Sequence, residues 1–225
     1  YGKDLGNRNL FLLNTFVNTD ERFPIKSVSK RHGEIKLLLQ ELVQKKGIYI
    51  SIGPLTNLAF LYDTYPDLLS QCEIIAMGGA INYRKPGTAE HNIRMDIEAA
   101  KKIFNADLNI RWILSDVTFT PRLRISKDHA VYKHIQRLSS KPTAMIKENL
   151  DRFYEDKYPD SYLHDPLTVM STTEEKLVQF SIKTITMREN GEFILSPDGK
   201  KTKVSTKVDY GLFFKHFEEI LQADR

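Results

Sequence analysis

Cysteine is nearly missing from this sequence, because Cys72 is the only one among the 225 residues. A single thiol excludes an internal disulfide, and a lone cysteine beside an apolar segment is usually a small core residue. We therefore expect Cys72 to belong to the core rather than to a catalytic site.

Long apolar runs are missing as well. A helix that crosses a bilayer needs about 20 predominantly apolar residues, and no such stretch occurs in the sequence. The first residues, YGKDLGNRNL, also lack the basic start and the apolar centre of a signal peptide. We expect a soluble, cytoplasmic protein that has no membrane partner.

Dense clusters of basic residues are also missing, although the formal net charge is +4 and the isoelectric point is near 9.0. Lys45 and Lys46 end a predicted helix, where cations suit the helix dipole, and three further lysines, Lys200, Lys201 and Lys203, flank a turn. Scattered charge of this kind is typical of a solvated surface. We expect no nucleic-acid partner, and nucleic-acid binding is the weakest of three functional alternatives.

The composition is that of an ordinary globular protein, with 41% hydrophobic and 28% charged residues. The length suits one α/β domain and is sufficient for a real core. We find no internal repeat and no low-complexity linker. We therefore expect one domain over residues 1–225.

Apolar strands alternate with helices in the first half of the chain. We predict strands at 48–52, 74–77 and 110–114, and helices at 34–46 with Gly47 as a stop, from Pro54 onward, and at 97–104 with Asp96 as N-cap. Strands that are apolar almost throughout are typical of a parallel sheet covered on both faces. The expected fold is therefore α/β, with a mostly parallel, Rossmann-like sheet between two layers of helices.

The second half is predicted to begin with helices and to continue with strands. Helices are expected over 129–138, over 142–153 and from Pro166. From Val178 the apolar residues alternate, which predicts a small antiparallel appendage near the C-terminus. Asp209 is the expected cap of a last helix over 212–221. Three of its side chains are expected to pack on the sheet: Phe213, Phe217 and Ile220.

Three short polar stretches stand where this fold places ligand sites, in loops beyond the carboxyl ends of parallel strands or at the start of a helix. They are GPLTN at 53–57, MGG at 77–79 with AEHN at 89–92, and HDP at 164–166. Taken singly, each has a structural explanation as a strand-to-helix turn, a hydrogen-bonded loop or a helix cap.

Together and in this order, the stretches resemble the inosine-uridine preferring nucleoside hydrolases. The pattern of that family contains GPLTN after one strand, MGG after the next, AEFN followed by DPEAA, and a late HD. The resemblance extends to YGKDLG at the start, to SDVT at 115–118 and to VSTKVDYGLFFKHFEEIL at the end. It implies a ribonucleoside N-glycosidase of purine and pyrimidine salvage, which releases ribose and a free base.

The resemblance also implies a metal and two catalytic residues. Calcium, the metal of the family, takes oxygen ligands, and the implied ligands are the backbone carbonyl of Thr56 and the carboxylate of Asp165. His164 would face the nucleobase as a general acid, a role that its ordinary pKa of about 6.5 permits. Asp165 and His164 are therefore the expected catalytic pair.

The implied substrate is a small nucleoside. Glu90 and Asn92 would hydrogen-bond ribose hydroxyls, and Met77 would lie against the sugar. Asn82 is a candidate replacement for an asparagine of the family, and His91 stands where the family often has phenylalanine, so it would contact the base. Two tyrosines, Tyr154 and Tyr158, either form a wall of the base site or pack internally.

The aspartate-rich DxDxxxDD motif of the family does not occur in the sequence. In the family those carboxylates supply most of the metal ligands and the general base. We therefore expect an N-terminally truncated domain that binds calcium weakly and hydrolyses nucleosides poorly, if at all. The alternative is a non-catalytic nucleoside-binding, ribose-binding or interaction module. Relatives suggest a homo-oligomer, either a dimer or a tetramer, whereas the base preference does not follow from the sequence.

Overall fold

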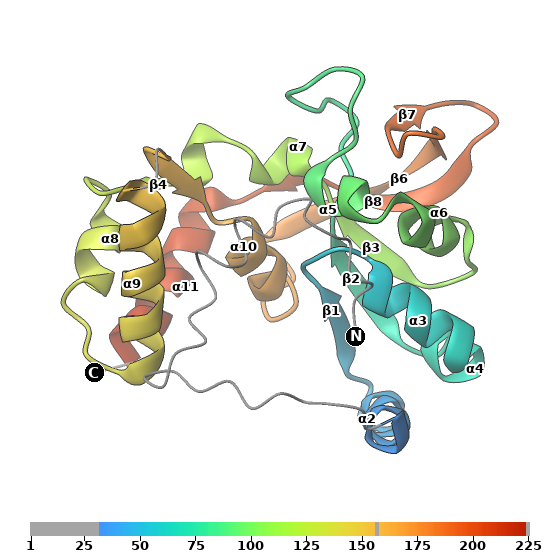
Figure 1. The fold of residues 1–225 in the computed structure, drawn as a ribbon, viewed down its shortest axis with the longest axis horizontal. Coiled ribbons are helices and arrows are strands. Elements are labelled where there is room, and N and C mark those ends of the chain that lie inside the picture. Colours follow the sequence, from blue (N-terminus) through green and yellow to red (C-terminus); the bar gives the residue numbers. More distant parts are fainter. Residues whose placement is uncertain (1–31, 156–157, 224–225) are drawn as a thin grey trace. The chain divides into compact units, whose positions relative to one another are not determined.

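The computed structural model describes residues 32–155 and 158–223. By their internal contacts these residues form two compact units. Unit 1 comprises the described parts of Lys30–Phe119 together with His164–Asp209, and unit 2 those of Thr120–Leu163 together with Tyr210–Arg225. Figure 1 labels the elements of both units. The expectation of one domain over the whole chain stays a prediction.

Unit 1 is built on a six-stranded sheet with the order β1-β2-β3-β8-β6-β7. Its four parallel strands are β1 (Ile48–Ser51), β2 (Glu73–Met77), β3 (Ile110–Ile113) and β8 (Lys200–Val208). β6 (Val178–Met187) runs antiparallel to β8 and to β7 (Phe193–Leu195). The predicted fold class is confirmed, and the antiparallel strands β6 and β7 join the parallel ones through the pairing of β8 with β6.

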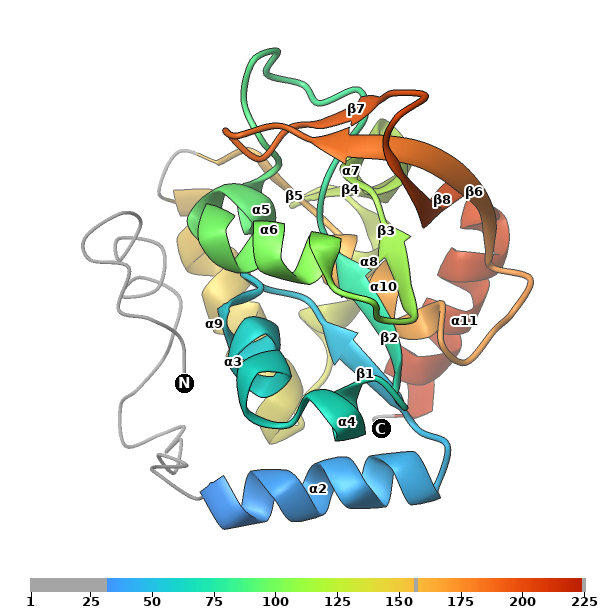
Figure 2. The ribbon, with the colours of Figure 1, turned by 90° about the vertical axis from the view of Figure 1, so that its right-hand side faces the viewer.

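Helices cover both faces of the parallel strands, as strands without a polar face require. The helices of unit 1 are α2 (His32–Gln44), α3 (Thr56–Thr64), α4 (Pro66–Leu69), α5 (His91–Met95), α6 (Ile97–Asn105), α7 (Ser115–Thr118) and α10 (His164–Met170). Ile74 and Ala76 of β2 share one buried cluster with Leu58 of α3 and Ile103 of α6. α10 contacts β2 from the opposite side, as Figures 1 and 2 show.

The buried cluster of unit 1 contains the residues that the apolar patterns predicted. Cys72 is only 2% exposed and belongs to it, so the prediction of a core cysteine is confirmed. Phe193 of β7 packs against Phe104 and Trp112, with ring centroids 5.1 and 5.5 Å away. These ring contacts bring β7, α6 and β3 together.

The helix predicted from Pro54 onward starts later than expected and is interrupted at Tyr65. It begins at Thr56 with Leu55 as N-cap and ends before Tyr65, and Pro66 then opens α4. The break has a steric cause, because proline disfavours the helical conformation of the residue before it. Further upstream, α2 ends at Gln44, two residues before the predicted end, and Gly47 N donates to Leu42 O over 2.8 Å.

Unit 2 combines helices with a two-stranded sheet. Its elements are a 3-10 turn (Pro121–Leu123), β4 (Arg124–Ser126), α8 (Ala130–Ile135), α9 (Lys141–Glu155), β5 (Asp160–Tyr162) and α11 (Tyr210–Ala223). β4 and β5 pair antiparallel. His129 does not start the helix but caps it, since its Nδ1 accepts a hydrogen bond from Val131 N over 3.2 Å.

Helix α11 packs through part of the expected stripe, since Phe213 is fully buried and its ring stacks on that of Phe217. Phe214, Phe217 and Leu221 join a cluster that includes Ile125. Ile220 lies beside that stripe and is 58% exposed, so the expected packing of this side chain on the sheet is wrong. No helix among the described residues is both long and apolar enough to span a membrane.

Candidate functional site

Polar groups gather in unit 1 beyond the carboxyl ends of β1, β2 and β3. The exits of β2 and β3 are joined directly, because Gly78 N donates to Ile113 O over 3.1 Å and Ser115 N donates to Gly79 O over 2.9 Å. Loops that leave adjacent parallel strands at the same edge form the ligand site of open α/β sheets. This edge is therefore the candidate functional site.

Glu90 is the best-anchored carboxylate at this edge. Its Oε2 accepts hydrogen bonds from the N–H groups of Gly79, Asn92 and Ile93 over 3.2, 2.9 and 3.3 Å, and the side chain thereby caps α5. Glu90 is only 5% exposed. Burial raises its pKa from the ordinary 4.5 to about 7, although the backbone N–H groups oppose the rise.

Asn92 is held against the end of β2. Its Nδ2 donates to the carbonyl of Met77 over 3.0 Å and to the Met77 Sδ over 3.2 Å. Both side chains are buried. The structure therefore brings together Met77, Glu90 and Asn92, which were predicted as ribose contacts.

Gly79 allows the chain to turn between these groups. Its φ is +75°, and a Cβ placed there would lie 2.4 Å from Cε2 of Phe193. A residue with a side chain would meet both backbone strain and a clash at this position. The MGG stretch is thus needed for the close approach of β7 to the exit of β2.

Thr56 and Asp96 connect the exit of β1 to α6. The Thr56 hydroxyl donates to Oδ2 of Asp96 over 2.6 Å, and Oδ1 of Asp96 caps α6 by accepting from Ala99 N over 3.1 Å. The predicted N-cap is confirmed. Thr56 lies at this edge, whereas the metal-binding role of its carbonyl stays a prediction.

Asp116 holds the loop over 80–88. Its Oδ2 accepts from Ile81 N over 2.9 Å, and its Oδ1 accepts from Asn82 N over 2.8 Å and from Asn82 Nδ2 over 3.1 Å. The amide of Asn82 therefore has a protein partner, and its proposed contact with the sugar stays a prediction. The role of Asp116 was missed, although SDVT was noted as part of the family pattern.

His164 is oriented by two residues of the chain after β3. Its Nδ1 lies 2.6 Å from the Thr118 hydroxyl, and its ring stacks on Phe119 with a centroid distance of 6.2 Å and an interplanar angle of 10°. Thr118 is fully buried. Where the hydroxyl donates to Nδ1, the neutral ring carries its proton on Nε2, and where the hydroxyl accepts from Nδ1–H, the proton lies on Nδ1. The sequence carried no signal for this pairing.

The environment makes His164 harder to protonate than the sequence suggested. Burial, then the charges of Arg84 and His91, lower its pKa from 6.5 to about 4. The expected role as a general acid was based on an ordinary pKa, so this structure removes that basis. The pKa of His91 is lowered as well, first by burial and then by Arg94 and Arg84.

Arg84 lies over the same group of rings. The guanidinium carbon is 4.1 Å from the centroid of Phe119 and 5.6 Å from that of Tyr83. Both His91 and His164 respond to its charge. Sequence reasoning missed Arg84, because its contact with Phe119 joins two loops that lie far apart in the chain.

Asp165 is the second residue of α10, next to His164, and lies in the same unit as Thr56. Burial of the carboxyl group raises its pKa from 3.8 to about 6, although the residue as a whole is exposed. Within 32–155 and 158–223 there is no cluster of three acidic, histidine or cysteine side chains suited to a metal. Calcium usually takes six to eight oxygen ligands, so the described residues do not by themselves fit calcium.

Tyr154 and Tyr158 belong to unit 2. The Tyr154 hydroxyl donates to Ile125 O over 2.8 Å and lies 3.2 Å from Ser161 Oγ. Tyr158 is 41% exposed and stacks on Phe153 with a centroid distance of 4.6 Å. Both have packing partners in their own unit, and their predicted contact with a nucleobase stays a prediction.

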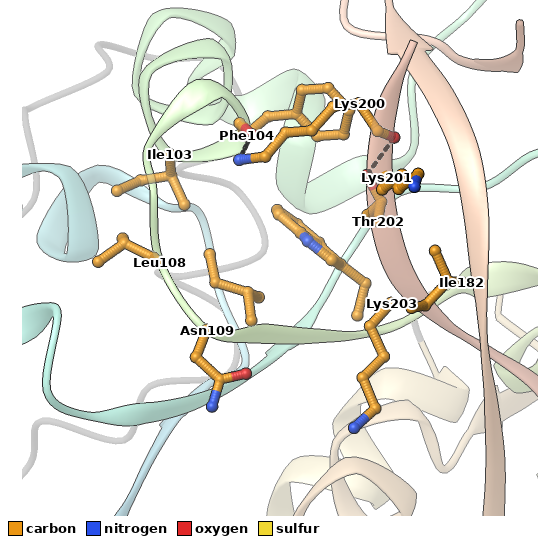
Figure 3. Close-up of a pocket in the computed structure, with 11 residues that line it drawn as sticks. Ile103, Phe104, Leu108, Asn109, Ile182, Lys200, Lys201, Thr202 and Lys203 are labelled. Atoms are coloured by element: carbon orange, nitrogen blue, oxygen red, sulfur yellow. Dashed lines mark hydrogen bonds between the residues drawn. The ribbon is translucent and has the colours of Figure 1, made fainter. Parts of the chain in front are cut away.

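A separate hollow of unit 1 lies at the opposite ends of the strands, where β3 and β8 begin (Figure 3). Trp112 and Ile103 are among its lining residues. The Lys200 Nζ donates to the carbonyls of Phe104 and Ala106 over 2.7 and 2.5 Å, and so caps the end of α6. This lysine stabilises a helix end, and the hollow is not part of the candidate site.

The chain is similar to known proteins over most of its length. The model of the inosine-uridine preferring nucleoside hydrolase family matches residues 13–215. A probable ribonucleoside hydrolase of Dictyostelium discoideum is 30% identical over 135 residues, which cover 56% of this chain and 39% of that protein. The pyrimidine-specific ribonucleoside hydrolase RihA of Salmonella newport is 28% identical over 169 residues, which cover 72% of this chain and 50% of that protein. The chain thus spans half or less of these relatives.

Solved structures show the same fold. A plant nucleoside hydrolase superposes with a TM-score of 0.72 at 21% identity, covering 92% of this chain and 72% of that one. A purine-preferring ribonucleoside hydrolase from Gardnerella vaginalis superposes with a TM-score of 0.71 at 22% identity, covering 89% of this chain and 68% of that one. An inosine-uridine preferring nucleoside hydrolase from Bacillus anthracis superposes with a TM-score of 0.64 at 22% identity, covering 83% of this chain and 64% of that one.

Proposed function

The chain belongs to the inosine-uridine preferring nucleoside hydrolase family, and from this premise we propose that it hydrolyses the N-glycosidic bond of ribonucleosides. The products are ribose and the free base. The observation that carries the proposal is the joint anchoring of Glu90 and Asn92 at the carboxyl end of β2, beside Met77. This arrangement presents a fixed carboxylate and a fixed amide at the edge where α/β sheets bind ligands.

The anchored pair suits a ribose. Oε2 of Glu90 accepts three backbone hydrogen bonds, and Oε1 is the oxygen that we propose accepts from a sugar hydroxyl. Asn92 donates through Nδ2 to Met77, and its Oδ1 is an acceptor for a second hydroxyl. Because both side chains are held by the backbone, they bind the sugar without a large loss of side-chain entropy.

Cleavage of the bond makes charge on both fragments. The sugar passes through an oxocarbenium-like cation, and the base departs with the electron pair of the broken bond. A buried carboxylate such as Glu90 favours the cation over the neutral sugar. His164 has a ring N–H in either protonation state, and with Thr118 on Nδ1 it can direct Nε2 to the base as a hydrogen-bond donor.

We propose calcium as the metal of the complete family site, with Asp165 and the Thr56 carbonyl as ligands. Bound calcium would hold hydroxyls and acidify a water molecule. Since the described residues do not complete such a site, we expect weak calcium binding by this chain. Calorimetric titration tests this expectation, and micromolar affinity would contradict it.

The partner that follows from the function is a small nucleoside. Similar proteins include one named pyrimidine-specific and one named purine-preferring, so both classes of base belong in the test. We further propose a dimer or tetramer, which light scattering tests, and a location in the cytoplasm, which cell fractionation tests.

The function is tested by incubating the protein with inosine and with uridine in calcium, and by measuring free ribose as reducing sugar. We expect slow, sustained release of ribose that disappears in Asp165→Asn. Saturable nucleoside binding without any release of ribose would contradict hydrolysis and would favour a non-catalytic binding module.

A further inference from the structure

We propose that Arg84 is a further catalytic residue, which binds the negative charge of the departing nucleobase. This inference rests on the proposed hydrolysis and deepens it, because it assigns a role in the departure of the base to the loop over 80–88. Arg84 matches no residue of the motifs that identified the site.

The first support is the position of the guanidinium. Arg84 stacks on Phe119 at 4.1 Å, and Phe119 in turn stacks on His164. Arg84 and His164 therefore both lie against the ring of Phe119, and His164 is the residue proposed to face the base. A nucleobase is planar too, and guanidinium groups bind planar anions through several N–H donors at once.

The second support is that the positive charge of Arg84 is not neutralised by an acidic side chain in the part of the chain that the structure describes. Arg84 takes part in none of the ion pairs that form between described residues. The side chain is exposed at its loop, and the cation is held by ring faces rather than by a carboxylate. An arginine that is positioned without being neutralised keeps its full charge for a ligand.

The third support is the anchoring of the loop. Asp116 accepts hydrogen bonds from the N–H groups of Ile81 and Asn82, two and three residues before Arg84. The first residues of the loop are therefore fixed to Asp116, which lies just after β3. A preorganised cation costs little reorganisation when charge develops in the transition state.

The reaction balances without a proton from Arg84. The bond between C1′ and the base nitrogen breaks, and its electron pair stays on the base, where carbonyl oxygens share the negative charge. Water adds its oxygen to C1′, and the proton that it loses ends on the base. Arg84 stays protonated throughout and stabilises the anion before that proton arrives.

The kinetic test compares substrates that need help at the leaving group with one that does not. Uridine must release a poor leaving group, whereas 4-nitrophenyl β-ribofuranoside releases a stable phenolate. For Arg84→Met we expect kcat/KM to fall about 100-fold with uridine and less than about threefold with the nitrophenyl riboside. Arg84→Lys should recover at least about tenfold of the uridine loss, because it restores the charge.

Lys85→Met is the matched control, since it removes the same charge from the next residue of the loop. We expect changes of less than about twofold with both substrates. Equal losses on uridine and the nitrophenyl riboside in Arg84→Met would overturn the proposal, and so would a Lys variant as poor as the Met variant. Either result would show that Arg84 only supports the loop through Phe119.

A binding experiment tests Arg84 without turnover and separates its failure from that of the proposed function. Barbiturate is an anion near neutral pH, and uracil is its neutral counterpart with the same ring. In calorimetric titrations with ribose present, we expect the wild-type protein to prefer barbiturate by about tenfold, and Arg84→Met to lose that preference. A wild-type protein without the preference overturns the role of Arg84, whereas hydrolysis itself is judged only by ribose release.

Discussion

The backbone N–H of Gly79 donates a hydrogen bond to Oε2 of Glu90 over 3.2 Å. This bond ties the exit of β2 to the residue that caps α5, across a loop of ten residues. It places a buried carboxylate at the ligand-binding edge of the sheet, so the same residue supports the fold and the proposed ribose site.

Glu90 should make stability depend on pH. Its pKa is raised from 4.5 to about 7 in the folded chain, so the native state binds more protons than the unfolded state between these values. The free energy of unfolding therefore falls as pH rises through this range. Relative to Glu90→Gln, the wild-type protein should lose roughly 2 to 3 kcal/mol between pH 5 and pH 8. Urea unfolding at both pH values measures this difference.

Glu98→Gln is the control for that experiment, because Glu98 is an exposed glutamate in the first turn of α6. The pH dependence of the stability difference between Glu98→Gln and the wild-type protein is the background from which the larger change for Glu90→Gln is read. If Glu90→Gln and the wild-type protein lose stability in parallel, Glu90 does not titrate as described.

Gly79→Ala should destabilise unit 1 by about 3 kcal/mol or more, since the new Cβ would combine a left-handed φ with a clash against Phe193. Gly87→Ala isolates the first effect, because its φ is +77° and nothing lies within 4 Å of the added Cβ. That variant should lose only about 1 kcal/mol. Equal losses in chemical unfolding would show that Phe193 does not pack against this turn.

Asp116→Ala should loosen the loop over 80–88 without unfolding unit 1. Two backbone N–H groups, those of Ile81 and Asn82, lose their acceptor. Their hydrogen exchange should accelerate by about tenfold or more, while the free energy of unfolding changes by roughly 1 kcal/mol. Asp128→Ala, at an exposed aspartate, is the control, and unchanged exchange in Asp116→Ala would contradict the anchoring role.

Thr118→Val should disturb the orientation of His164, because it removes the hydroxyl that bonds Nδ1 and keeps a similar volume. Nitrogen-15 NMR of the histidine rings should report a mixture of tautomers in place of one. We expect kcat/KM for uridine to fall about fivefold to tenfold. Thr118→Ser restores the hydroxyl and should recover both readouts. A Val variant with wild-type spectra would show that the hydroxyl does not select the tautomer.

The sequence predicted the elements whose causes are local. Asp96 precedes an apolar helical pattern, and its side chain caps α6 as expected. The apolar strands followed by helices predicted the parallel sheet, because burial on both faces leaves no polar alternation. Boundaries were less accurate where steric effects decided them, as at Tyr65 before Pro66.

The missed features are a cap on a very short helix and several contacts between distant residues. Glu90 caps a helix of only five residues, which is too short to show a periodic pattern. The stack of Arg84 on Phe119 and the bond between Thr118 and His164 join segments that meet only after the sheet has formed. The shift in the pKa of His164 has the same origin, since it results from burial that sequence spacing does not report.

The central claim is that Glu90 and Asn92 hold a ribose. Calorimetric titration with uridine, 2′-deoxyuridine and 3′-deoxyuridine tests it most directly, because a binding measurement does not depend on turnover. We predict that at least one deoxynucleoside binds about 10- to 100-fold more weakly than uridine, and that Glu90→Gln reduces this difference. Equal affinity for all three nucleosides, in a protein that binds them, would contradict the claim.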